Sequence, residues 1–473
     1  MSGRRLIGPV DTIWLNMDRP SNLMVIHSLI LLDGRLDPDR LRSLLESRLL
    51  GPYPVFRQRA RPPVLGLGLP YWEDDPDFAL ERHLHRTTLP EPGDDAALRA
   101  YVDAQLHRPL DRSHPLWEMH VLDGYDGGSA LLCRFHHALA DGIALIRVLL
   151  SLTDETPEGD AALQPEGPAL ADRAGRPQAP STLGLGLATV GATARVLGAA
   201  AGVGVASLGA MARLATPTGA RHAMGLGLRT SLVVASLLLT ENHDSPLGGD
   251  PGIAKHVVWS EPFPLPELKL AGRAVRGTLN DVLMSAVAGA FGRYVADHGG
   301  EPADLTTMVP VNLRDLGVPL PPELGNRFAL VFFHYPSSVA GVRERLAETK
   351  RRMDWLKHSP EATITFQLIQ GIGRTSADIE RLLVDFFANK ALGVTTNVPG
   401  PTTLRYFAGI PITGMLGWVP GSARQTVGVC ILTYADTVRV GFLADADRVR
   451  DPEQLVTALG LEIEALTRLG RPA

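Results

Sequence analysis

Two stretches of alternating strand-like and helix-like pattern make up most of the chain, and a long segment poor in charge separates them. In the first stretch, the apolar run from Val25 to Leu32 predicts a strand, and residues 38–49 predict a helix after a short turn. Residues 130–137 and 142–153 repeat this order of strand and helix. Alternation of this kind is typical of α/β folds, in which helices cover a sheet.

The same alternation begins again near residue 255. Because 473 residues are too many for one ordinary core, we expect two α/β domains, residues 1–155 and 251–473, joined by a linker and crossover at 156–250. The expected strands of the second domain are 255–260, 306–311, 328–335, 427–434 and 438–444, and the expected helices are 266–274, 279–298, 339–358 and 452–469.

The joining segment from 182 to 240 is rich in Gly, Ala, Leu and Val. Its longest uncharged run, residues 196–212, lies between Arg195 and Arg213 and is short for a bilayer span. We therefore expect helices that pack on the protein or lie on a membrane surface, and no transmembrane helix.

Charge and cysteine content exclude some classes of protein. The formal net charge of -5 argues against a general nucleic-acid binder, which needs a basic surface to neutralise phosphates. Cys133 and Cys430 stand alone in apolar runs, so no disulfide framework is expected, and a reducing compartment fits. The N-terminal residues show no signal-peptide core. We expect a cytoplasmic protein.

The most informative segment is Cys133-Arg134-Phe135-His136-His137, followed by Ala-Leu-Ala-Asp-Gly. Side chains alternate along a strand, so Cys133, Phe135 and His137 share an apolar face, while Arg134 and His136 share the other. His137 then ends the apolar row where the strand enters a loop. An imidazole at the edge of a cleft suits a general base, because its ordinary pKa lies close to working pH.

Other interpretations of this segment remain open from the residues alone. A histidine at a strand end can be purely structural, Asp141 can be the N-cap of the next helix, and Gly142 can serve the turn. His136, His137 and Asp141 also suggest a metal site. Adjacent histidines on a strand point apart, however, so one ion cannot easily use both, and we expect no metal.

The spacing His-His-x-x-x-Asp-Gly is the signature of the coenzyme A-dependent acyltransferase superfamily, which includes chloramphenicol acetyltransferase and peptide-synthetase condensation domains. Further segments follow in an order that resembles the bacterial wax ester synthase/diacylglycerol acyltransferase family over nearly the whole chain. The Asp-Phe-Gly-Trp-Gly segment of condensation domains and plant relatives is absent. The further segments are Pro115-Leu116-Trp117, Asn280-Asp281-Val282-Leu283, Val309-Pro310-Val311-Asn312-Leu313-Arg314, Gly325-Asn326-Arg327 and Thr396-Asn397-Val398-Pro399-Gly400-Pro401.

The resemblance implies two chloramphenicol-acetyltransferase-like α/β domains with an active-site tunnel between them. It implies that His137 is the base, in agreement with the strand-face argument, that His136 is a supporting residue, and that Asp141 organises the site without touching substrate. Acyl-CoA is then a co-substrate, diacylglycerol or a long-chain alcohol is the acceptor, and no other cofactor is expected. Both substrates bind together, so no covalent enzyme intermediate is needed.

Three further residues are candidates for the site. Asn280 would hydrogen-bond near the reacting centre, or else serve only the fold. Thr278 and Asp281 fit a helix-capping pattern, which we favour for Asp281. Thr433, at the end of an expected strand, is our candidate oxyanion donor, although a strand threonine with no role is the simpler interpretation. Trp117, Asn326 and Pro399 are interpreted as packing and turn residues.

Two other functions compete with lipid acyl transfer. One is an acyltransferase of secondary metabolism that uses a carrier-protein thioester, and the other is a non-catalytic lipid-droplet protein. Because the expected acceptors are insoluble, we expect peripheral attachment to a membrane or lipid droplet through part of 182–240, including Leu183, Leu185 and Leu187.

Overall fold

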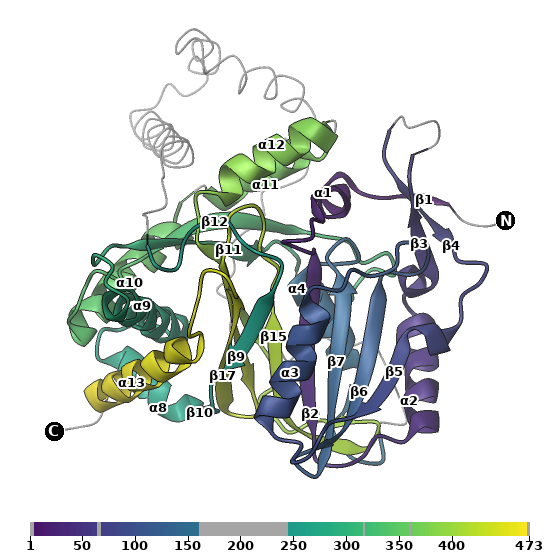
Figure 1. Ribbon diagram of the computed structural model, residues 1–473, viewed down its shortest axis with the longest axis horizontal. Helices are drawn as coiled ribbons and strands as arrows, with labels where there is room; N and C mark the ends of the chain where they lie inside the picture. The colour runs from purple at the N-terminus through teal and green to yellow at the C-terminus, as the bar shows by residue number, and fades with distance from the viewer. Residues whose placement is uncertain are drawn as a thin grey trace, which may run out of the picture.

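The computed structural model describes residues 4–63, 68–159, 245–315, 317–359, 361–375 and 377–470. Within them, two seven-stranded sheets and one three-stranded sheet form the framework, with the first large sheet on the right of Figure 1 and the second on the left. The two large sheets confirm the expected pair of α/β units. The helices expected within 182–240 lie outside the described residues.

The first large sheet has the strand order β5-β6-β7-β2-β15-β14-β8. Its core strand β2 (Val25–Leu32) pairs with β7 (Gly128–His136) on one side and with β15 (Ile410–Trp418) on the other. Strands β14 and β15 belong to the second half of the sequence. A division at residues 155 and 251 therefore does not enclose one sheet in each range, because the second half supplies the partner that covers the open edge of β2.

The second large sheet has the order β10-β17-β16-β13-β11-β12, with β9 also paired to β17. Strand β17 (Thr437–Asp445) passes close to β15 of the first sheet. A Cβ at Gly441 would lie 2.9 Å from Nε1 of Trp418 and 3.0 Å from the Gly417 carbonyl oxygen, so a glycine is needed for this approach. Trp259 and Trp418 meet there with ring centroids 5.7 Å apart, and an apolar cluster joins the two halves.

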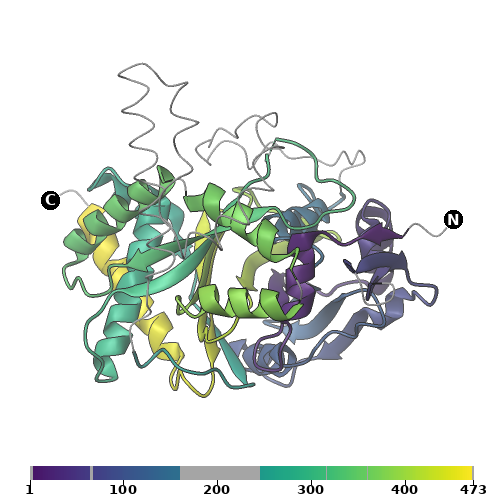
Figure 2. The same cartoon turned by 90° about the horizontal axis from the view of Figure 1, so that it is seen from above.

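Helices at the junction of the halves position the candidate site. Helix α4 (Gly142–Ser151) begins at its N-cap Asp141, and α9 (Leu279–Asp297) begins with a capping box of Thr278 and Asp281. Helix α1 (Pro9–Met17) packs against α11 (Glu361–Ile372) and α12 (Ala377–Ala388), as the view from above shows (Figure 2). The sequence patterns did not predict these last three helices.

Most expected elements are present at nearly their expected bounds. The strands at 25–32, 328–335 and 427–434 agree residue for residue. The helix expected at 38–49 is α-helical to Leu45 and continues as a π-helical turn to Leu50. Cys133 and Cys430 are both buried free thiols. In the described part of the chain, no helix is both long and apolar enough to traverse a bilayer.

The remaining elements have the following bounds. In the first half these are β1 (Arg5–Leu6), α2 (Pro38–Leu45), β3 (Gln58–Arg61), β4 (Tyr71–Asp74), β5 (Leu84–Thr88), α3 (Asp95–Leu106), β6 (Trp117–Tyr125) and β8 (Thr153–Asp154). In the second half they are β9 (Lys255–Trp259), β10 (Phe263–Pro264), α8 (Leu265–Arg273), β11 (Leu305–Asn312), β12 (Phe328–Tyr335), α10 (Val342–Lys357), β13 (Gly393–Pro399), β14 (Tyr406–Phe407), β16 (Val427–Tyr434) and α13 (Glu453–Gly470).

Candidate active site

His137 lies directly after the last residue of β7 and opens the loop that leads to α4. Its backbone N–H donates to the Met24 carbonyl, with an N···O distance of 2.7 Å, so the loop starts in continuity with the sheet. The side chain is half-buried, whereas its neighbours on both sides are buried. The imidazole therefore stands at the end of an apolar row, as the alternation along the strand predicts.

Hydrogen bonds of Asn326 determine which nitrogen of the His137 ring carries the proton. The Asn326 amide nitrogen donates to Asp11 Oδ1 at 2.8 Å and to the His137 carbonyl at 2.7 Å. The Asn326 amide oxygen must then be the acceptor for His137 Nδ1, 3.0 Å away. This network assigns the proton to Nδ1 and leaves the lone pair of Nε2 available to accept a proton.

Aromatic side chains surround the same ring. Trp14 of α1 stacks on His137 with ring centroids 4.1 Å apart, and Phe328 of β12 lies 5.9 Å away. Burial among these groups lowers the pKa of His137 from 6.5 to about 4, against the opposing effect of the Asp141 charge. The imidazole is consequently neutral at pH 7, which is the form that a general base requires.

Asp11 of α1 completes the chain of contacts behind the histidine. Its Oδ1 accepts from both the backbone and the side-chain nitrogen of Asn326, each at 2.8 Å. Burial raises the pKa of Asp11 to about 6, and the two bonds from Asn326 partly oppose this rise. The series His137, Asn326 and Asp11 thus joins three parts of the chain: the loop after β7, the loop before β12, and α1.

Asp141 holds the loop to the second half of the chain. One carboxylate oxygen caps α4 by accepting from the Ala144 N–H at 2.8 Å. The other accepts from the Arg327 N–H at 2.9 Å and from Arg314 Nε at 3.0 Å. Arg314 also donates to the carbonyls of Leu324 and Gly325. Asp141 therefore fixes the start of α4 and fastens residues 324–327 beside the histidine loop.

His136 turns to a different set of partners. Its Nδ1 accepts from the Ala138 N–H at 3.1 Å, so the proton is on Nε2, which lies 3.1 Å from Asp18 Oδ2. The adjacent imidazoles thus bind residues in different parts of the chain, Asp18 after α1 and Asn326 before β12, as expected for neighbours on a strand. Gly142 is the first residue of α4 and has no left-handed backbone conformation. A Cβ at this position would meet open space, so the turn itself does not require glycine.

The three further candidates form contacts within the second half. Asp281 Oδ2 accepts from the Thr278 N–H at 2.7 Å, as the capping pattern predicts. Asn280 Oδ1 accepts from the Asn397 amide at 2.8 Å. Thr433 Oγ1 accepts from the Gly400 N–H at 3.1 Å. The hydrogen bonds described for these side chains do not include an atom of His137.

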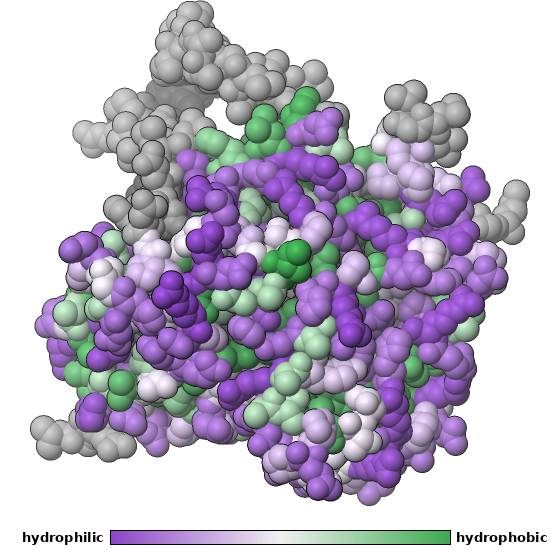
Figure 3. All heavy atoms as spheres, in the orientation of Figure 1, coloured by the Kyte–Doolittle hydropathy of each residue, from purple (hydrophilic) through white to green (hydrophobic). Residues whose placement is uncertain are grey.

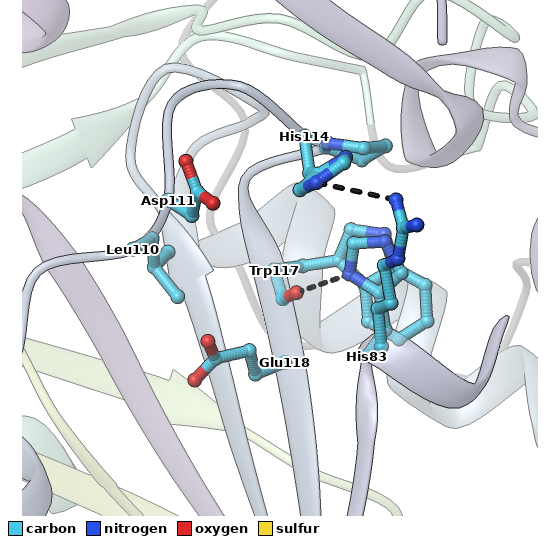
Figure 4. A pocket seen from close by; sticks show the side chains of 8 residues that line it. His83, Leu110, Asp111, His114, Trp117 and Glu118 are labelled. Atoms are coloured by element: carbon cyan, nitrogen blue, oxygen red, sulfur yellow. Dashed lines mark hydrogen bonds between the residues drawn. The ribbon is translucent and has the colours of Figure 1, made fainter. Parts of the chain in front are cut away.

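A hollow of about 340 Å³ opens beside the start of β6 (Figure 4). Trp117 lies against it and is buried, with Nε1 donating to the Phe56 carbonyl at 2.9 Å, in agreement with a packing role. His137 is not part of its lining, so this hollow is separate from the candidate site. The lining residues are Arg82, His83, Leu110, Asp111, His114, Pro115, Trp117 and Glu118.

The sequence interpretation of Asn326 as a turn residue was wrong, because its side chain orients His137. The sequence marks Gly325-Asn326-Arg327 as a family segment, but it does not indicate that Asn326 contacts His137. Asp11 and Trp14 were also missed, and no pattern in the first 20 residues marks them. Arg314 belonged to a recognised segment without an assigned role.

Comparison with known proteins relates both halves to one family. Residues 7–283 match the wax ester synthase/diacylglycerol acyltransferase catalytic domain, and residues 324–467 match the C-terminal domain of the same family. A putative diacylglycerol O-acyltransferase of Mycobacterium tuberculosis is 29% identical over 99% of this chain and 98% of its own length. The O-acyltransferase WSD of Acinetobacter baylyi is 22% identical over 97% of this chain and 96% of its own. The solved wax ester synthase/diacylglycerol acyltransferase of Marinobacter aquaeolei VT8 shares the fold, with a TM-score of 0.67, 19% identity and coverage of 98% of this chain and 99% of that one.

Proposed function

Since the chain belongs to the wax ester synthase/diacylglycerol acyltransferase family, we propose that it transfers a long-chain fatty acyl group from acyl-CoA to the hydroxyl of diacylglycerol, with His137 as the general base. A fatty alcohol in the same position would give a wax ester. The observation that carries the proposal is the bond from His137 Nδ1 to Asn326, because it reserves Nε2 for the substrate proton.

The proposed reaction needs one base and no covalent enzyme intermediate. His137 Nε2 removes the proton from the acceptor hydroxyl as its oxygen attacks the thioester carbonyl carbon. A tetrahedral oxyanion forms, and the carbon–sulfur bond then breaks. The imidazolium returns its proton to the leaving coenzyme A thiolate, so that the neutral ring is restored.

Thr433 is our proposed donor to the oxyanion. Its oxygen accepts from the Gly400 N–H, which leaves the hydroxyl proton free to donate elsewhere. Thr433→Val preserves the shape of the side chain and is expected to lower kcat by roughly 10² to 10³. An unchanged kcat in a folded Thr433→Val protein would remove this residue from the mechanism and return it to a structural role. Asn280 stays a candidate for substrate contact.

The experiment that tests the function supplies palmitoyl-CoA with either diacylglycerol or hexadecanol to purified protein. Thiol release and the lipid product are followed together, and a carrier-protein palmitoyl thioester is compared with palmitoyl-CoA. Product formation only from the carrier thioester would favour an enzyme of secondary metabolism, and the absence of any transfer would favour a non-catalytic lipid-droplet protein.

His137→Ala is expected to fold and to lose roughly 10² to 10⁴ in rate. His136→Ala is the matched control, because it removes the neighbouring imidazole that binds Asp18 and leaves the Asn326 bond in place. It should lose thermal stability while keeping much of its activity. Equal losses of activity in two folded variants would contradict the role of His137.

We also propose that the protein works at a lipid surface. The side chains of three apolar residues on α12 are exposed to solvent: Ile379 by 51%, Leu382 by 70% and Phe386 by 44%. Apolar side chains are visible at the top of the molecule in Figure 3, where α12 lies. Helix α12 packs on α1, which carries Trp14. Replacing all three by Ser should weaken co-sedimentation with liposomes and spare transfer to a soluble alcohol. Full liposome binding by this variant would show that α12 is not the attachment site. Leu183, Leu185 and Leu187, which lie outside the described residues, would then be the next residues to replace.

A further inference from the structure

Three side chains that the proposed reaction does not use gather on β5 and β6. His85 of β5 lies opposite His120 of β6 in the parallel pairing, and Glu118 precedes His120 by two residues, on the same strand face. One ligating atom from each residue lies within 4.8 Å of the other two. Among the described residues, this is the group that offers three such atoms together.

The surroundings of His120 direct one of its nitrogens toward the group. The Tyr101 hydroxyl of α3 lies 2.9 Å from His120 Nδ1, while His120 Nε2 lies 3.3 Å from Glu118 Oε2. A partner on the far nitrogen is the arrangement that orients a histidine ligand in metal sites. Arg134 donates to Glu118 Oε2, the same oxygen that lies near His120 Nε2, and a carboxylate oxygen has a second lone pair with which it can bind an ion.

Distances within the group fit a small ion. Two ligands on tetrahedral zinc, each about 2.0–2.2 Å from the metal, are roughly 3.4 Å apart. His120 Nε2 and Glu118 Oε2 already have this separation. His85 is exposed, so rotation of its side chain can close the remaining distance without moving the sheet. Glu118 lines the hollow of Figure 4, which gives the group an open path to solvent.

We propose that His85, Glu118 and His120 bind one divalent transition-metal ion of the zinc type, with water as a further ligand. Two imidazole nitrogens and one carboxylate oxygen suit Zn²⁺ and disfavour Mg²⁺ and Ca²⁺, which prefer oxygen ligands. Strand β5 is the edge of the first sheet, so the ion ties this edge to β6 and, through Tyr101, to α3. The site is separate from His137 and Asp141, and the proposal departs from our expectation that the protein holds no metal.

The test uses full-length protein without an affinity tag, treated with a chelator and then dialysed against ZnCl₂. We expect one zinc per chain by elemental analysis, a higher Tm with Zn²⁺ than with Mg²⁺, and visible d–d absorption when Co²⁺ replaces Zn²⁺. These readouts need no acyl transfer, so they are independent of the proposed function. Absence of bound zinc in the folded wild type would overturn the proposal.

Variants locate the ion. His85→Ala changes an exposed ligand and should abolish the Tm increase and the Co²⁺ spectrum. Tyr101→Phe keeps all three ligands and should weaken zinc affinity by about 10- to 100-fold. His358→Ala, an exposed histidine at the end of α10, is the control and should bind zinc like the wild type. Retention of wild-type zinc affinity by His85→Ala would place the ion elsewhere and overturn the assignment.

Discussion

Helices α4 and α9, one in each half of the chain, each have an aspartate at the N-terminus, Asp141 as the N-cap of α4 and Asp281 in the first turn of α9, but the two carboxylates have different partners. Asp281 bonds back to Thr278, three residues away, and its other oxygen is buried with no hydrogen-bond partner in the described structure. Asp141 caps α4 with one oxygen and binds Arg314 and Arg327 with the other, more than 170 positions away along the chain.

The difference shows how the same helix-capping chemistry can serve local or long-range structure. The start of α9 is complete once its own first turn forms. The start of α4, and with it the loop carrying His137, is complete only when Arg314 and Arg327 of the second half lie against it. His137 is therefore positioned by contacts that neither half has alone.

The largest expected effect is on the free energy of unfolding, and it tests the difference between Asp141 and Asp281. Asp141→Ala removes a cap worth about 1 kcal/mol and leaves the buried guanidinium of Arg314 without its carboxylate, a loss of roughly 3 kcal/mol or more. Asp281→Ala removes only a capping box, about 1 kcal/mol. Asp141→Asn keeps a capping oxygen and should fall between wild type and Asp141→Ala.

Urea unfolding of the three variants checks this order. Matching losses for Asp141→Ala and Asp281→Ala would show that the contacts across the halves contribute little, and an unshifted transition for Asp141→Ala would remove its structural role altogether.

The second expected effect is on catalysis. Asn326→Ala removes the acceptor for His137 Nδ1, so the imidazole loses its fixed tautomer and orientation, and kcat/KM should fall by roughly 10². The matched control is Asn22→Ala, because Asn22 is a buried asparagine whose amide likewise reaches the other half, at the Ala423 carbonyl. A comparable loss of activity in Asn22→Ala would indicate that general docking of the halves, and not orientation of the ring, controls the rate.

The smallest expected effect is a displaced pH profile. Burial lowers the pKa of His137 to about 4, so kcat/KM should stay level from pH 8 down to about pH 5 and fall below that, instead of falling from pH 6.5. For the same reason, the stability contributed by the neutral ring is present above pH 6.5 and is lost as pH falls through about 4. Trp14→Ala opens the ring to water and should move the fall in rate upward in pH.

Asp11 needs a separate control, because its pKa is raised to about 6 and it changes charge within the same range. Its contribution to stability has the opposite direction, present below its ordinary pKa of 3.8 and lost as pH rises through about 6. A fall in rate at pH 6.5 that persists in Asp11→Asn would contradict the lowered pKa of His137.

Local physics explains which features the sequence could predict. The facing of Cys133, Phe135 and His137 follows from strand alternation alone, and the capping box of Thr278 and Asp281 spans a single helical turn. Both predictions needed no knowledge of distant residues. The partnership of Asn326 with His137, 189 positions away, depends on how the two halves dock, and no local pattern encodes it.

The missed elements have weak local signals. Strand β15 contains Pro411, Gly414 and Gly417, all unfavourable in strands, and it is stabilised by pairing with β2. Helix α11 contains several β-branched residues, which lower helix propensity, and its partners on α1 lie at the opposite end of the chain. In both cases tertiary packing outweighs the local preference.

The place of β15 in the first sheet determines how late during synthesis that sheet can be completed. Strand β2 leaves the ribosome early, yet its partner on one side is finished only at residue 418. At about 5–20 residues per second, this takes roughly 20 to 80 seconds, during which an apolar strand edge is open to other chains. Any nascent chain released before residue 418 keeps that edge uncovered, so truncated products of this gene should depend on chaperones far more than the finished protein does.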